Sequence, residues 1–274
     1  ELLLAGSVVW TRTPGTSIYL VEHYFVLDAS SILFLGLIST VFFGVTIYVW
    51  YRVSAGLMPQ LFAGFVARSL LFFASSVLAV LSNHLLAMWG FLELGTFIIA
   101  PLIFFARGAD AVRASWKYLL FSIVGLGFNF IGLLCLARGM GGAHGEHELT
   151  FYIDGLQQIP TLGEPLWWRL GLALMVFGLG TKLGLAPMYS WLPDAYDEAP
   201  PSVTTMLAAV QFNCVILALF REVGLLRSFD PTLISEELIV MGVLSIAIAA
   251  LHIIKADNYK RLIAYASINH AGTI

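Results

Sequence analysis

The chain has 274 residues, of which 59% are hydrophobic and only 11% are charged. Soluble domains carry about 25% charged residues, so this composition excludes a water-soluble enzyme and a disordered chain. Fourteen Lys and Arg against seventeen Asp and Glu give a net charge of -3, which excludes the basic surface of a nucleic-acid-binding protein. The mean hydropathy of +0.88 indicates an integral membrane protein.

Apolar runs long enough to cross a membrane follow one another along the chain. A hydrocarbon core about 30 Å thick requires about 20 apolar residues of helix. Seven runs reach this length, at residues 30–51, 61–82, 84–106, 116–138, 166–188, 202–220 and 237–255. An eighth begins near residue 259 and is still apolar at Ile274. Without period-two alternation or a dividing linker, the sequence predicts an all-α, polytopic transmembrane helix bundle that forms one membrane domain over residues 1–274.

The predicted loops alternate between the two sides of the membrane. One side carries seven Lys and Arg residues within or beside its loops, and the opposite side carries five. The loops of the first side are 52–60, 107–115, 189–201 and 256–259. The positive-inside rule places the first side in the cytoplasm. Since neither an initiator Met nor a signal-peptide pattern opens the sequence, we expect an internal piece of a longer polytopic chain.

Glu93 lies about ten residues inside the third predicted span, in the run LLAMWGFLELGTFIIAPLIFF. An ionisable group at the centre of a span costs about 2.5–3.5 kcal/mol on insertion scales, so it requires a structural or functional reason. One interpretation is a carboxyl group hydrogen-bonded to a neighbouring helix or neutralised by desolvation. We favour a proton-carrying group with a moveable partner, because no countercharge lies nearby in the sequence.

Lys182 lies beside a predicted break in the fifth span. Pro187 follows five residues later and cannot form the helical hydrogen bond to the carbonyl of Leu183. Broken helices with a charge beside the break form ion sites near the membrane midplane in transporters. The pattern therefore predicts at least one broken helix with Lys182 as a functional cation. A tolerated kink, whose freed carbonyls bind the lysine, is the alternative.

Two further basic residues and one polar loop are weaker candidates. Lys117 begins the fourth span, where it could act in transport or extend to the membrane interface. His270 lies in the eighth run and can exchange protons near neutral pH, although a structural hydrogen bond is an equal alternative. The string AHGEHE in loop 139–165 could be taken for a metal site, but it lacks a second ligand pair, and we interpret it as solvated. We expect neither a metal nor a cofactor in this chain.

Four motifs carry a resemblance that runs from about Tyr24 to the end of the chain. They are WGFLEL around Glu93, ASWKYLLF around Lys117, GLGTKLGLAPMYSWLPDAYDEAPPSV from Gly178, and NYKRLIAYASINHAG from Asn258. In type and order they resemble the antiporter-like, proton-conducting membrane subunits of the complex I superfamily. The greatest similarity is to the F-type subunit of hydrogenase-four and formate hydrogenlyase. The third motif is long and specific.

The resemblance implies that Glu93 and Lys182 form a charge pair on adjacent helices. It also implies that Lys117 is the lysine of the intervening helix and that His270 is a relay group on the central axis. A histidine that some members carry on the helix after the break is absent. Physically, a buried ammonium loses its proton when its carboxylate partner moves away. At 4 Å and an effective dielectric constant near 20, that attraction amounts to about 4 kcal/mol.

The predicted function is therefore a proton-translocating membrane subunit of a complex I-like, redox-driven or energy-coupled complex in a bacterial or archaeal inner membrane. Expected partners are other membrane and soluble subunits, the lipid bilayer, and protons or Na+, but no nucleic acid. One alternative is the membrane subunit of an energy-coupled bicarbonate or CO2 uptake complex with a zinc-containing soluble partner. A cation/proton antiporter subunit and a structural subunit without conduction are the others.

Overall fold

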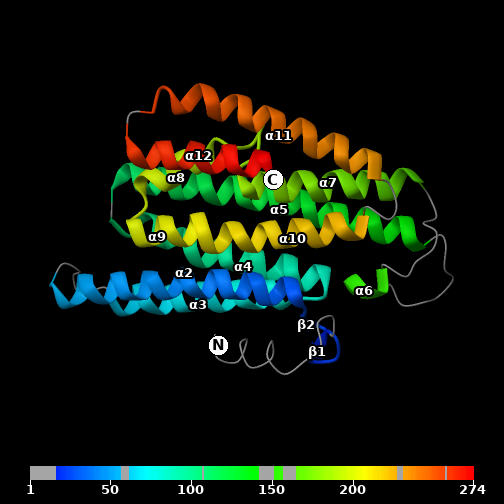
Figure 1. Ribbon diagram of the computed structural model, residues 1–274, viewed down its shortest axis with the longest axis horizontal. Coiled ribbons are helices and arrows are strands. Elements are labelled where there is room, and N and C mark those ends of the chain that lie inside the picture. The colour runs from blue at the N-terminus through cyan, green and yellow to red at the C-terminus, as the bar shows by residue number, and fades with distance from the viewer. Residues whose placement is uncertain are drawn as a thin grey trace.

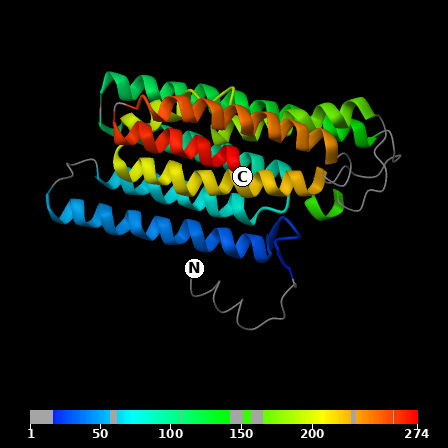
Figure 2. The same cartoon turned by 45° about the horizontal axis from the view of Figure 1, so that its top comes forward.

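The protein is a bundle of helices that lie side by side along one long axis (Figure 1). The computed structural model describes residues 17–56, 62–106, 108–141, 151–156, 165–226, 231–256 and 258–274. Within these residues, six helices are long and apolar enough to cross a membrane. A turned view shows the same arrangement, with α2 at one edge of the bundle (Figure 2). The predicted all-α, polytopic membrane bundle is confirmed.

A short hairpin precedes the helices, and the elements follow one another without a large loop domain in the described residues. In chain order they are β1 (Ile18–Leu20), β2 (Phe25–Leu27), α2 (Ala29–Ser54), α3 (Phe62–Leu81), α4 (Leu85–Ile103), the 3-10 turn η1 (Phe104–Ala106), α5 (Ala109–Gly141), α6 (Ile153–Leu156), α7 (Pro165–Leu183), α8 (Trp191–Glu198), α9 (Pro201–Thr205), the π-helical segment η2 (Met206–Gln211), α10 (Phe212–Leu226), α11 (Pro231–Ile253) and α12 (Tyr259–Thr273).

Three of the predicted loops are wrong because they are largely helical; one of them, 221–236, is largely covered by the end of α10 and the start of α11. α5 begins at Ala109, so most of the predicted loop 107–115 belongs to this helix. The stretch contains three alanines, which favour a helix, and Arg113 pairs with Asp110 three residues earlier, a spacing that supports the first turns. The predicted loop 189–201 likewise contains α8.

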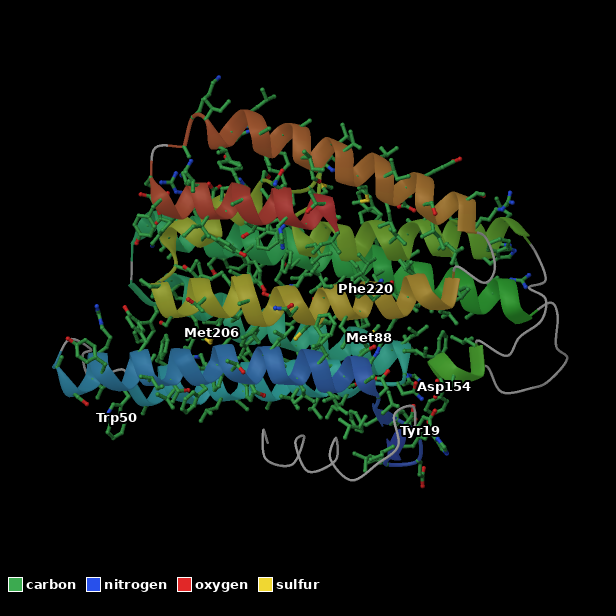
Figure 3. All side chains as sticks on the ribbon, in the orientation of Figure 1. Tyr19, Trp50, Met88, Asp154, Met206 and Phe220 are labelled. Atoms are coloured by element: carbon green, nitrogen blue, oxygen red, sulfur yellow. The ribbon has the colours of Figure 1, made fainter. Side chains whose placement is uncertain are left out.

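The β1–β2 hairpin is a feature that the sequence pattern did not predict, because each strand has only three residues. Asn83 attaches it to the bundle: its backbone N–H donates to the carbonyl of Tyr24 at 2.8 Å. The Asn83 Nδ2 donates to the carbonyl of His23 and to Asp154 Oδ2, both at 3.1 Å. Hydrogen bonding to Asp154 also raises the pKa of the Tyr19 phenol. Figure 3 shows Tyr19 and Asp154 together at this end of the bundle.

The helix ends gather at two opposite ends of the bundle. At the "hairpin end" lie β1–β2, the junction of α3 and α4, and α6 (Figure 1). At the "α8 end" lie α8, the ends of α2 and α4, and the starts of α5 and α12; Trp50 marks this end in Figure 3. The two ends agree with the two predicted sets of loops. The assignment of the α8 end to the cytoplasm stays a prediction.

α5 and α7 touch through their backbones along a seam of four glycines, Gly125 and Gly132 on α5 and Gly171 and Gly178 on α7. A Cβ atom added to Gly178 would lie 2.5 Å from the Gly125 carbonyl oxygen. One added to Gly132 would lie 2.7 Å from the Gly171 carbonyl oxygen. Small residues permit such close approach between membrane helices, where packing drives association. We call this contact the glycine seam.

Gly178→Ala should lower the free energy of unfolding by about 1–3 kcal/mol, the usual cost of overpacking a close contact. Gly127→Ala on α5 is the matched control, since its Cβ atom would meet nothing within 4 Å. Thermal unfolding of the purified protein in detergent measures both variants. Equal stability of the two variants would contradict the rigid contact.

Candidate functional site

The helix that carries Lys182 is interrupted directly after it. α7 ends at Leu183, and Gly184 adopts the left-handed conformation, with φ of +79°. A helical conformation resumes only at Trp191, the first residue of α8. Pro187 lies inside the interruption, as predicted. The broken helix is therefore confirmed, and the predicted helical span 166–188 ends earlier than expected.

Side chains of neighbouring elements form hydrogen bonds with backbone groups at the break, in addition to the backbone bond from the Gly184 N–H to the Thr181 carbonyl. The Trp191 indole Nε1 donates to the carbonyl of Thr181 at 3.1 Å. The Ala186 N–H donates to Ser245 Oγ on α11 at 2.8 Å. Because unpaired backbone groups are costly away from water, these contacts hold the interruption in one conformation. The last turn of α7, which carries Lys182, is thereby held in place.

Lys182 extends into the protein interior, and only 3% of its surface is exposed. Its Nζ donates to Thr96 Oγ1 on α4 and to Tyr118 Oη on α5, the latter at 3.3 Å. It also lies 4.9 Å from the centre of the Tyr118 ring. Thr96 and Tyr118 are themselves fully buried. Lys182 therefore faces packed helices rather than lipid, as a functional cation requires.

Glu93 lies on α4, one turn before Thr96. Its side chain interacts electrostatically with Lys182. Its Oε2 atom is buried without a hydrogen-bond partner in the described structure. Glu93 therefore lies beside the cluster that Lys182 forms with Thr96 and Tyr118. Glu93 and Lys182 form no direct ion pair among the salt bridges of the described residues. A buried acceptor without a partner is costly, so Glu93 has a physical reason to change its position or protonation.

Gln211 extends the cluster beyond Lys182. Its Nε2 donates to Tyr118 Oη at 2.8 Å, and it is the last residue of η2. Single π-helical turns within α-helices occur frequently at functional sites. Sequence reasoning missed Gln211, Thr96 and Tyr118 because they are uncharged. Two amide side chains inside one apolar span, Gln211 and Asn213, were a signal that could have drawn attention to this helix.

Lys117 lies outside this cluster, at the α8 end. Its Nζ pairs with Asp194 Oδ2 of α8 at 2.7 Å, and 36% of its side chain is exposed. Adjacent residues on a helix point in different directions, so Tyr118 faces the interior while Lys117 faces a pocket of about 480 Å³. Arg261 of α12 lines the same pocket and binds Asp197 Oδ2 at 2.8 Å and Asp194 Oδ1 at 3.5 Å.

His270 lies on the exposed side of α12. Its carbonyl accepts a hydrogen bond from Thr273 Oγ1 at 2.8 Å, but within the described residues its ring forms no hydrogen bond. The structure therefore does not join His270 to the Lys182 cluster. The AHGEHE string falls in residues 142–150, outside the described residues. No group of three or more His, Cys, Asp or Glu side chains in the described part of the chain could hold a metal ion.

A broken helix with a buried lysine beside the break, inside a bundle of membrane-spanning helices, is the architecture of an ion-transporting membrane subunit. Residues 82–274 match the NADH:quinone oxidoreductase/Mrp antiporter family of transmembrane proteins. The chain therefore belongs to this family, which confirms the resemblance seen in the motifs. The matched segment contains Glu93, Lys117, Lys182 and His270.

Named relatives support the same assignment. The chain is 31% identical over 216 residues to a hydrogenase-4 component F homologue of Methylacidiphilum infernorum, covering 72% of this chain and 42% of the relative. It resembles a chain of respiratory complex I from Thermus thermophilus, with a TM-score of 0.77 and 25% identity over 99% of this chain and 55% of that one.

Two solved structures of lower identity share the fold. A chain of the archaeal membrane-bound sulfane sulfur reductase has a TM-score of 0.86 at 23% identity, covering 99% of this chain and 55% of its own length. A chain of the Mrp complex from Dietzia sp. DQ12-45-1b has a TM-score of 0.83 at 21% identity, covering 100% and 50%. The chain thus spans about half the length of the proteins it matches.

Asp194→Asn should weaken the attachment of α8 to α5 and α12 by about 1 kcal/mol or less, because partly exposed ion pairs contribute little. The loss should disappear at high salt, where such pairs are screened. Thermal unfolding at low and high NaCl measures the difference, with Asp110→Asn as the control for a pair within one helix. A loss that persists at high salt would show that Asp194 acts through packing instead.

Proposed function

We propose that this chain is a proton-translocating membrane subunit of a complex I-like, multi-subunit complex, and that Lys182 is the group that carries the proton. The observation that carries this proposal is the buried Lys182 ammonium beside the helix break. A cation in such a place is stable only while a nearby carboxylate compensates for its lost hydration. Glu93, one turn from Thr96, supplies a carboxyl group whose Oε2 is unpartnered in the described structure.

The neighbours of Lys182 suit both of its charge states. Thr96 and Tyr118 hydroxyls accept hydrogen bonds from an ammonium, and hydroxyls can equally donate to a neutral amine. When Glu93 approaches, attraction favours the ammonium; when it withdraws, desolvation favours release of the proton. Gln211 donates a hydrogen bond to the Tyr118 hydroxyl and so holds that hydroxyl in position beside Lys182.

The transported ion in this proposal is the proton rather than Na+. A fixed ammonium repels a metal cation, and Na+, like other hard cations, requires a shell of oxygen ligands.

Relay roles for Lys117 and His270 stay predictions, with Lys117 suited to proton collection at the α8 end. We also propose location in a bacterial or archaeal inner membrane. Iron–sulfur or nickel–iron subunits that copurify with the chain would support the redox-driven function, whereas a zinc-containing soluble subunit would support bicarbonate or CO2 uptake.

Lys182→Ala should lower proton movement by about 10²-fold or more, as expected for loss of a positioned proton-transfer group. Lys182→Arg should be similarly impaired, since a guanidinium does not deprotonate in proteins. Proton uptake is followed with a pH-sensitive dye in vesicles that contain the complete complex, after electron transfer or an imposed Na+ gradient. Copurification of partner subunits confirms assembly, and Lys255→Ala is the exposed control. Wild-type uptake by Lys182→Ala would refute the assignment.

Glu93→Gln keeps the shape and most hydrogen bonding of the side chain but removes its charge. We expect turnover to fall by about tenfold, since the Lys182 ammonium would lose a compensation worth more than about 1.4 kcal/mol. The same vesicle assay compares Glu93→Gln with Glu93→Ala. If the glutamine variant is fully active and the alanine variant is not, Glu93 acts only through hydrogen bonding and packing.

A further inference from the structure

A second buried carboxyl group lies in the bundle, away from Lys182. Glu222 is on α10, one turn before its last residue, Leu226, and only 1% of it is exposed. The Asn129 Nδ2 of α5 donates to Glu222 Oε1 at 3.0 Å and to Oε2 at 3.1 Å. The same Nδ2 also donates to the Met175 carbonyl of α7 at 3.1 Å. Glu222 is therefore bound at the junction of three helices.

This junction supplies too few hydrogen-bond donors for a carboxylate ion. An amide Nδ2 has two hydrogens; one is directed to the Met175 carbonyl, which leaves one for both oxygens of Glu222. A buried carboxylate requires a cation or several donors to replace its lost hydration. Within the described residues, Asn129 is the one hydrogen-bond partner of the Glu222 side chain. The arrangement thus favours a Glu222 that holds a proton.

Charged groups on the surrounding elements do not compensate for the negative charge that an ionised Glu222 would carry. The neighbouring Arg221 turns away, donating to the Ser82 carbonyl and to Ser31 Oγ, each at 2.7 Å. Arg221 also lies 3.7 Å from Asp28 at the start of α2. The other acids on elements that pack against α10 are Glu93 of α4, Asp154 of α6 and Glu236 and Glu237 of α11, and these carry the same charge as Glu222. The basic groups on those elements form no salt bridge with Glu222 among the salt bridges of the described residues; they are Arg52 of α2, Arg68 of α3, Arg169 and Lys182 of α7, and His252 of α11. Arg221 therefore belongs to the hairpin end, and it places Glu222 close to that end.

A line of polar groups on α5 connects this junction with Lys182. Tyr118 contacts Lys182, and Asn129 lies 11 residues further along the helix, about 16 Å at 1.5 Å per residue. Between them is Ser122, at helical spacing on the same face. Ser122 is fully buried, and its hydroxyl has no hydrogen-bond partner among the described residues, so it is free to accept or donate a proton. Tyr118, Ser122 and Asn129 thus form a stripe beside the glycine seam.

We propose that Glu222 is a second proton-binding group, held in position by Asn129, through which protons pass between Lys182 and the hairpin end. In the outward step, the Lys182 ammonium releases one proton to the Tyr118–Ser122 stripe and becomes a neutral amine. Each hydroxyl or intervening water accepts one proton and passes on another, so none retains a charge. A Glu222 carboxylate accepts the proton, becomes a carboxylic acid, and later releases it to water at the hairpin end. The path rests on the proposed function, whereas proton binding at Glu222 does not.

The proton on Glu222 is tested directly by infrared spectroscopy of the complete complex in membranes during a pH titration. We expect a carboxylic-acid C=O band that titrates in the wild type and is absent in Glu222→Gln. Glu236→Gln, which alters an exposed acid of α11, should retain the band. Asn129→Leu should shift the frequency of this band, because the Glu222 carboxyl group would lose its hydrogen bond from Asn129 Nδ2. A spectrum unchanged by Glu222→Gln would overturn the proposal.

Transport distinguishes this proposal from the preceding one. Glu222→Gln should slow proton movement about 10²-fold, in the range for a positioned proton donor, whereas Glu236→Gln should be unaffected. Glu222→Asp retains a carboxyl group and should retain a titrating band; it is the variant to use if Glu222→Gln does not assemble. Full transport with a titrating Glu222 would overturn the path. Full transport by Lys182→Ala would instead refute the role of Lys182 and leave the Glu222 spectrum as an independent result.

Discussion

The close contact between α5 and α7 is the constraint on which the polar interior depends. Gly125 and Gly178 bring the two backbones so near that a single added carbon atom would collide with a carbonyl oxygen. At this spacing Tyr118 reaches Lys182 on one side of the seam, and Asn129 reaches the Met175 carbonyl on the other. Larger residues would separate the helices, and both polar contacts would be lost together.

The break in α7 determines where Lys182 lies in the bundle. A continuous helix would satisfy its backbone internally, whereas the interrupted one combines local backbone bonds with side-chain hydrogen bonds from Trp191 and to Ser245. Lys182 consequently projects from a helix end that α8 and α11 hold in place. A cation can occupy such a position because the surrounding helices, not lipid, supply the polar groups around it.

The bundle also separates two electrostatic environments that the sequence places side by side. Lys117 and Tyr118 are neighbours in the chain, but the first pairs with Asp194 at the partly exposed α8 end and the second lies in the buried cluster. Partly exposed charges exchange readily with water, whereas buried ones change state only when their partners move. This gradient from exposed to buried groups is what a pathway for protons across a membrane requires.

The sequence by itself determined the membrane class, the helical architecture, the family and the broken helix, because long apolar runs and Pro187 act locally. It also identified Glu93 and Lys182 as ionisable groups inside predicted spans, since a charge inside an apolar run is conspicuous in any fold. Which residues meet was decided only by the tertiary structure. Thr96, Tyr118, Gln211 and the Asn129–Glu222 pair became visible through helix packing, and packing likewise separated Lys117 and His270 from the cluster. Glu222 is ionisable, but the predicted span ended at residue 220, so the sequence placed it outside the apolar run. Uncharged side chains carry no signal of burial along the chain, and spacing within one helix cannot specify the face of another that it contacts.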